Sequence, residues 1–249
     1  MIKHCIIMGS SYKQGTRIAL DITESCLINQ KFIEDLIISI KRECEWDAPL
    51  SMHFIQTDSN EWSSVEQFDP FFRGVKSYQD ISEFAEALKR DGTLFGIDVA
   101  KYILSMMHHC THLKLQKLTY LCYADYLCSH YHKLFEDTIY AFDYGPVVKS
   151  VYDSFKGSRY IESQEEIQKK THELPTRSRI LCSDHGLEKL KSIDSTLRRY
   201  CLMDASELVE LTHQNGTPWE KSYHGGTYEV IQDATIIKYH CNETSCQIL

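Results

Sequence analysis

A dense group of imidazoles and one thiol, formed by His108, His109, Cys110 and His112, is the part of the sequence most suggestive of a metal ion. His108 and His112 are four residues apart, so on one continuous helix they could bind zinc together. Thr111, however, is a typical N-cap residue and predicts that a new helix starts between them. The chain also has no Cys-x-x-Cys pair. We therefore predict no metal site.

A glycine-containing loop, Gly9-Ser-Ser-Tyr-Lys-Gln-Gly-Thr16, follows an apolar strand and precedes a predicted helix. Backbone N–H groups at a helix N-terminus bind phosphate, and the loop faintly resembles that of flavin reductases. It lacks the lysine placement of a phosphate-binding loop and the glycine spacing of a dinucleotide site. A flavin- or nucleotide-dependent enzyme is therefore the least favoured interpretation, which a yellow colour or a thermal shift with nucleotide would support.

Nucleophilic chemistry has no clear sequence signature either. Ten cysteines and twelve histidines allow many chance pairs, and there is no Gly-x-Ser-x-Gly elbow. We predict no catalytic residue, no cofactor and no enzymatic activity. The last four residues, Cys246-Gln-Ile-Leu249, fit a C-a-a-X box whose leucine would favour geranylgeranylation. This predicts membrane contact only in a eukaryotic cytosol, as an alternative function: a prenylated, host-membrane-targeted effector or adaptor.

Charge and hydropathy limit the partners. The net charge of −8 argues against nucleic acid as the main partner, because phosphate binding needs a basic surplus. No apolar stretch is long enough for a signal peptide core or a membrane span. The cysteines are scattered, several within apolar helical patterns, so we predict a cytoplasmic protein whose thiols are mostly free and buried.

The elements that would position any site fall into two regions. In residues 1–92 we predict a strand at Cys5–Met8, a helix over 16–45, a strand at Met52–Asp58 and a short helix from Asp80 to Gly92. This is a small α+β N-terminal extension.

Residues 93–249 are more helical. The spacing predicts helices over 97–107, 112–131, 184–200 and 204–212, another directly after Pro146, and short strands at Phe135–Phe142 and Thr235–Tyr239. A polar loop covers about 157–180. The fold class is therefore mainly α with a few short strands (α+β), and the helix over 112–131 is apolar on most sides and should be buried.

The segment Asp143-Tyr-Gly-Pro146 is predicted to be a sharp strand-to-helix joint. Proline suits the first turn of a helix, and Gly145 allows the chain to turn before it. Tyr144 should pack its ring and keep its hydroxyl near solvent. Asp143 should cap the helix or pair with Lys117, which is a structural role.

Polar residues also interrupt the apolar helix and flank a later turn. Lys114, Gln116 and Lys117 form either a solvated stripe or a patch that contacts a partner or fixes the core; the sequence does not decide. Thr212-His213 and Pro218-Trp219 flank the turn 214–217. We expect Trp219 in the core rather than as an exposed binding hot spot, and His213 to orient the turn by hydrogen bonding.

Several of these stretches, taken in order, carry a resemblance. They are Asp98-Val-Ala100, Tyr102-Ile103, Leu113-Lys-Leu-Gln-Lys-Leu-Thr-Tyr120, Tyr144-Gly-Pro-Val-Val148, Leu211-Thr-His213 and Pro218-Trp219. Together they are similar to the Panacea domain of SocA-like antitoxins and the phage-associated protein GepA, over about Gly96 to Tyr239. The chain departs from the family pattern at Phe142, where tryptophan is usual, at Lys149, where proline is common, and in the long polar spacer.

The resemblance implies a protein-binding role. It predicts an antitoxin-like module that neutralises a cognate toxin by direct contact, and in SocA-like members the complex also presents the toxin to a ClpXP-type protease. Residues 1–92 lie outside the domain, and we expect this extra region to help determine which toxin is bound.

Overall fold

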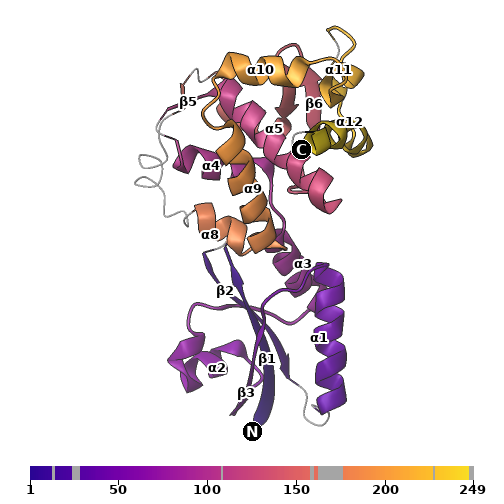
Figure 1. The fold of residues 1–249 in the computed structure, drawn as a ribbon. Coiled ribbons are helices and arrows are strands. Elements are labelled where there is room, and N and C mark those ends of the chain that lie inside the picture. Colours follow the sequence, from indigo (N-terminus) through magenta and orange to yellow (C-terminus); the bar gives the residue numbers. More distant parts are fainter. Residues whose placement is uncertain are drawn as a thin grey trace. The chain divides into compact units, whose positions relative to one another are not determined.

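The chain folds as two units, Met1–Thr93 and Leu94–Leu249, and we describe each by itself (Figure 1). The computed structural model describes residues 1–12, 15–23, 29–107, 109–157, 160–161, 176–226 and 228–246. Helices predominate and the strands are confined to small sheets, which confirms the predicted fold class.

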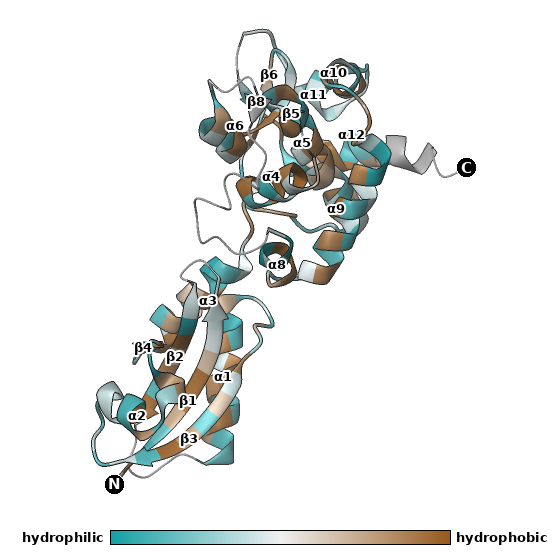
Figure 2. Cartoon of the chain, turned by 90° about the vertical axis from the view of Figure 1, so that its left-hand side faces the viewer, coloured by the Kyte–Doolittle hydropathy of each residue, from teal (hydrophilic) through white to brown (hydrophobic). Residues whose placement is uncertain are grey.

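The N-terminal unit is built on a four-stranded sheet. Its strands are β1 (Ile2–Ser11), β2 (Thr16–Thr23), β3 (Ser51–Thr57) and β4 (Lys76–Tyr78), in the order β3-β1-β2-β4. β1 pairs antiparallel with both β2 and β3, while β2 pairs parallel with β4. β1 and β2 are among the most apolar segments of the unit, as Figure 2 shows. Side chains of β1 and β2 are buried on both faces of the sheet, so both faces are covered by other parts of the unit.

Alternate residues of β1 contribute to two separate cores. Ile7 packs with helices α1 (Gln30–Cys44) and α3 (Ile81–Gly92) on one face. Ile6 and Met8 pack on the other face, with α2 (Trp62–Phe68) and the 3-10 turn η1 (Pro70–Phe72). This alternation follows from the two-residue period of a strand. The helices begin at side-chain caps: the side chains of Asn29 and Asp80 accept hydrogen bonds at the starts of α1 and α3.

The predicted helix over 16–45 is wrong in its first part. Thr16–Thr23 is strand β2, and the helix begins only at Gln30. Ile18, Leu20 and Ile22 recur every second residue, the strand period, and are framed by β-branched threonines. The phosphate-loop hypothesis fails for the same reason, because its glycine loop joins two antiparallel strands instead of opening a helix. Lys13 and Gln14 of that loop lie outside the described residues.

The C-terminal unit surrounds one buried helix, α5 (His112–His130). Its other helices are α4 (Gly96–Ser105), α6 (Lys149–Phe155), α8 (Thr176–Leu181), α9 (Gly186–Tyr200), α10 (Ala205–His213), α11 (Pro218–Ser222) and α12 (Asp233–Cys246). α4, α6, α9, α10 and α12 all contact α5. The side chain of Thr111 accepts from the N–H of Lys114 and caps α5 as predicted.

Short strands complete this unit. β6 (Ile139–Phe142) lies between β7 (Gly145–Val148) and β9 (Glu229–Val230), and all pairings are antiparallel. β5 (Cys110–Thr111) pairs with β8 (Tyr160–Ile161). Of the predicted polar loop over 157–180, residues 158–159 and 162–175 lie outside the described part of the chain, and its end forms α8.

Three predictions for this unit are corrected. The strand at 135–142 is confined to Ile139–Phe142, and the predicted strand at 235–239 belongs to helix α12. Ile236 and His240 are four residues apart and both buried, which is helical spacing. The expectation of free thiols fails for Cys128 and Cys241, which form a disulfide between α5 and α12.

Candidate functional site

Four of the family-type motif residues, Gln116, Lys117, His213 and Trp219, contact the hairpin formed by β6 and β7, which we call the motif hairpin (Ile139–Val148). Two buried side chains of α5 bind the backbone of β7. The N–H of Val148 donates to Gln116 Oε1 at 2.9 Å, and Lys117 Nζ donates to the carbonyl oxygen of Pro146 at 2.9 Å. Pro146 and Val148 are two residues apart in a strand, so both groups point away from β6. α5 therefore supplies partners that a neighbouring strand would otherwise provide.

This placement resolves the open question about the polar residues of α5. Lys117 is fully buried and Gln116 almost so, so they do not belong to a solvated stripe. Lys114 is only partly buried, and its Nζ donates to the carbonyl oxygen of Cys201, just after α9. Tyr120, on the same helix, is buried in the hydrophobic core of the C-terminal unit. All four therefore contact the domain itself, and burial lowers the pKa of the Lys117 amine from 10.5 to about 7.

Gly145 is required by space as well as by conformation. Its φ is +96°, a backbone conformation that L side chains rarely adopt. A Cβ at this position would lie 2.7 Å from Lys117 Nζ and 2.9 Å from His213 Cε1. The absence of a side chain thus lets the buried amine and the imidazole approach the hairpin backbone from two helices.

Residues of α10 and α11 bind the start of the hairpin turn. His213 Nδ1 lies 2.6 Å from the Val209 carbonyl oxygen, and its Nε2 lies 3.3 Å from that of Asp143. The ring of His213 packs on Trp219 with centroids 3.7 Å apart. Trp219 is buried and donates from Nε1 to the Phe142 carbonyl oxygen at 2.8 Å. Thr212 Oγ1 stays within its own helix, bonded to the carbonyl of Leu208.

The joint at Pro146 differs from the prediction. Gly145 and Pro146 belong to strand β7, and α6 begins at Lys149. Asp143 neither caps that helix nor pairs with Lys117: its Oδ1 accepts from the hydroxyl of Tyr223 at 2.8 Å. Asp137 instead accepts from the N–H of Ser150 at the start of α6. The sequence misled because Pro-Val-Val suits an edge strand as well as a first helical turn.

Tyr144, at the tip of the motif hairpin, is 71% exposed rather than packed. Nearby, Phe142 stacks on Tyr228 with centroids 4.0 Å apart and contacts Tyr152 at 5.4 Å. Tyr228 is itself 58% exposed. We call Phe142, Tyr144, Tyr152 and Tyr228 the aromatic surface. The aromatic surface borders the backbone of the motif hairpin, which contacts with α5, α10 and α11 hold in place.

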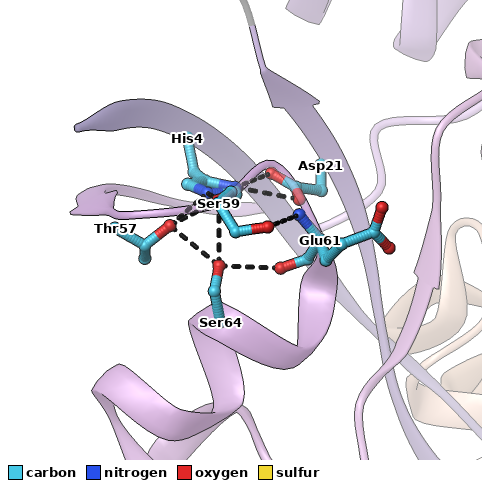
Figure 3. A network of polar contacts seen from close by, with 6 residues as sticks. All are labelled: His4, Asp21, Thr57, Ser59, Glu61 and Ser64. Atoms are coloured by element: carbon cyan, nitrogen blue, oxygen red, sulfur yellow. Dashed lines mark hydrogen bonds and ion pairs between the residues drawn. The ribbon is translucent and has the colours of Figure 1, made fainter.

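A second polar constellation, in the N-terminal unit, was missed at the sequence level (Figure 3). His4 Nδ1 lies 3.0 Å from both carboxylate oxygens of Asp21, and its Nε2 lies 2.9 Å from Thr57 Oγ1. The order carboxylate, imidazole, hydroxyl is that of a catalytic triad. The available signal was a histidine directly before the apolar run Cys5–Met8.

The arrangement is nevertheless closed. The Thr57 hydroxyl donates to the Ser59 carbonyl oxygen at 2.6 Å, and His4 Nε2 lies 3.0 Å from the same oxygen. His4 and Thr57 are both buried, and Ser64 Oγ completes the network. The hydroxyl proton is therefore directed at a carbonyl rather than at the imidazole. These contacts join β1, β2, β3 and the start of α2, and burial raises the pKa of Asp21 while its bond to His4 opposes that shift.

Other predicted site residues fall outside what the structure describes. This is so for His108 and for Gln247–Leu249, and the side chain of Cys246 is likewise not described. Within the described ranges, no three His, Cys, Asp or Glu residues are grouped so as to hold a metal ion. In the same part of the chain, no helix has the length and apolar character needed to cross a bilayer.

Part of the C-terminal unit is similar to a known family of domains. Residues 115–220 match the model of the family described as antitoxin SocA-like, Panacea domain. The match confirms the predicted resemblance to the Panacea domain family, and it includes the motif hairpin, His213 and Trp219. It is shorter than the predicted extent of about Gly96 to Tyr239: it begins within α5, so it does not include Asp98–Ala100 or Tyr102–Ile103 of α4, and it ends before α12. Searches of curated proteins and of solved structures found no match.

Proposed function

We propose that this protein is an antitoxin that binds a cognate toxin and neutralises it by direct contact. The observation that carries the proposal is the family match over residues 115–220, in which Gln116, Lys117, His213 and Trp219 contact one hairpin. No chemistry is needed for this role, so we propose a non-enzymatic protein without a cofactor. We also propose that it acts in the cytoplasm, where the Cys128–Cys241 pair would be held reduced. Neutralisation would follow from covering the active surface of the toxin.

The aromatic surface is the part of the matched region best suited to contact the toxin. Exposed tyrosines next to a fixed backbone are typical of binding hot spots, because little side-chain entropy is lost on binding. Buried motif residues such as Lys117, Gln116 and Trp219 would act indirectly, by holding the hairpin in shape. We further propose that the N-terminal unit helps select the toxin, and that the complex presents the toxin to a ClpXP-type protease.

The test is co-expression of the tagged protein with the small gene that neighbours its own. Growth rescue and a stoichiometric complex are expected, and pulse-chase with and without the protease measures toxin turnover. Tyr144→Ala should weaken rescue while the melting temperature is retained. Tyr131→Ala is the matched control, because Tyr131 is also 71% exposed but follows the C-terminus of α5.

Two results would count against the proposal. The absence of any toxic neighbour would remove the antitoxin role and leave prenylation at Cys246 to be tested by incorporation of labelled isoprenoid. Equal rescue by both tyrosine variants would exclude the aromatic surface as the toxin contact, while leaving the antitoxin role intact.

A further inference from the structure

Strand β3 is an open edge of the N-terminal sheet. The order β3-β1-β2-β4 places β3 at one end, and among the residues that the structure describes no strand pairs with its outer side (Figure 2). β3 is seven residues long, whereas the opposite edge, β4, has three residues and begins with Lys76. A row of backbone N–H and C=O groups on β3 is therefore left for another strand.

The sequence of β3 does nothing to prevent such pairing. Ser51-Met-His-Phe-Ile-Gln-Thr57 contains no lysine, no acidic residue, no proline and no glycine. Proteins usually protect long edge strands with charges, prolines or bulges, because bare edges pair with other chains. The strand also exposes apolar side chains: Met52 is 37% exposed and Phe54 is 56% exposed, both on the sheet face that carries α1.

The other face of β3 borders an open groove of about 490 Å³. His53 and Ile55 line it from the strand, and Phe71 and Phe72 line it from η1. Phe71 is 48% exposed and packs edge-on against Phe72, with ring centroids 5.1 Å apart. Asp69, just before η1, also lines the groove. An added strand would thus find main-chain hydrogen-bond partners on β3 and exposed aromatic side chains on both faces of the sheet.

We propose that the occupant of this edge is β3 of a second copy of the chain, paired antiparallel about a two-fold axis at Phe54. In this register Met52 faces Gln56 of the other copy and His53 faces Ile55, so every side chain stays on its own face. The two four-stranded sheets become one continuous sheet. Such a contact is self-complementary, as a two-fold interface must be.

The distribution of charge leaves β3 as a place where a second copy can approach without repulsion between the paired strands. The chain carries a net charge of −8, so two copies repel over most of their surfaces. β3 has no formal charge, so pairing it with itself opposes no like charges. The inference does not depend on the antitoxin proposal, because it requires no toxin.

The test is the mass of the full-length protein in solution, by light scattering and sedimentation, over a range of concentrations. We expect a dimer for the wild type. Phe54→Lys and Phe54→Glu each place like charges opposite one another at the two-fold axis, and each should weaken the dimer at least tenfold. Mixing the two variants should restore a dimer, because the lysine introduced in one copy would then face the glutamate introduced in the other.

Ile38→Lys is the matched control, because Ile38 is 53% exposed on α1 of the same unit, and this variant should dimerise like the wild type. Unchanged far-ultraviolet circular dichroism would show that the Phe54 variants are folded. A wild type that stays monomeric overturns the proposal, as does a dimer that Phe54→Lys leaves intact. Protection of amides 51–57 from hydrogen exchange only when a toxin is bound would also overturn it, because a different strand would then occupy the edge.

Discussion

Replacing Lys117 by methionine tests the central contact of the motif hairpin through its pH dependence. Lys117 is fully buried, and its pKa falls from 10.5 to about 7 because burial disfavours the charged amine. Between these two pH values the unfolded chain holds a proton that the folded chain has lost. Stability rises with pH wherever the unfolded state binds more protons, so the contribution of Lys117 becomes more favourable from pH 7 towards pH 10.

The magnitude follows from the two pKa values. Each unit of difference corresponds to about 1.4 kcal/mol, and proton linkage then gives a gain of about 2 kcal/mol between pH 7 and pH 9. Lys117→Met removes the titrating group together with its bond to Pro146. Urea unfolding of both proteins at several pH values should therefore show the wild type gaining about 2 kcal/mol relative to the variant over this range.

Lys114→Met, on the same helix, controls for the loss of a lysine that is only partly buried. Parallel stability curves for the wild type and Lys117→Met would refute the reasoning. If Lys117→Met does not fold, the titration of the wild-type lysine can be followed by NMR of its side-chain carbons. A Lys117 signal that titrates above pH 9.5 would contradict a pKa depressed by burial.

Three further predictions concern other contacts. Gly145→Ala should destabilise the protein by about 1 to 3 kcal/mol, because a side chain at φ +96° is strained and meets Lys117; urea unfolding measures this. His4→Leu should lower the free energy of unfolding by about 3 to 5 kcal/mol, because Asp21 would stay buried without its partner. The double variant His4→Leu/Asp21→Leu should recover much of that loss, and equal stability of the single and double variants would contradict the prediction. Cys241→Ser should lower stability by about 2 to 5 kcal/mol, because the bridge joins residues 113 apart, and dithiothreitol should affect the wild type but not the variant.

The sequence predicted secondary structure best in segments where the apolar residues recur with a single period. The 112–131 helix, its Thr111 cap and the helix ending at Gly92 agree with the structure, since long apolar patterns with caps leave few alternatives. Residues 16–23 were misassigned because isoleucine and leucine fit both the helical and the strand period in a short window. There, pairing of β2 with the preceding strand β1 determined the outcome, and propensity within β2 alone does not reveal that pairing.

The candidate site was predicted in its residues but not in its connections. The motif order identified Lys117, Gly145 and His213, yet nothing in the sequence indicates that a buried amine binds the carbonyl of Pro146. The position of Asp143 before Pro146 suggested that it caps helix α6. Asp137, which precedes β6 in the chain, has that role instead, because it accepts from the N–H of Ser150. His4, Asp21 and Thr57 come from three strands, so only the sheet register brings them together.

The burial of α5 on every side has a consequence for how the C-terminal unit opens. Because α4, α6, α9, α10, α12 and the motif hairpin all rest on this one helix, it can be exposed to water only when most of its neighbours leave together. Its amide hydrogens should therefore exchange with deuterium only through near-complete unfolding of the unit. A protease that unravels this unit would have to separate these neighbours before α5 is exposed.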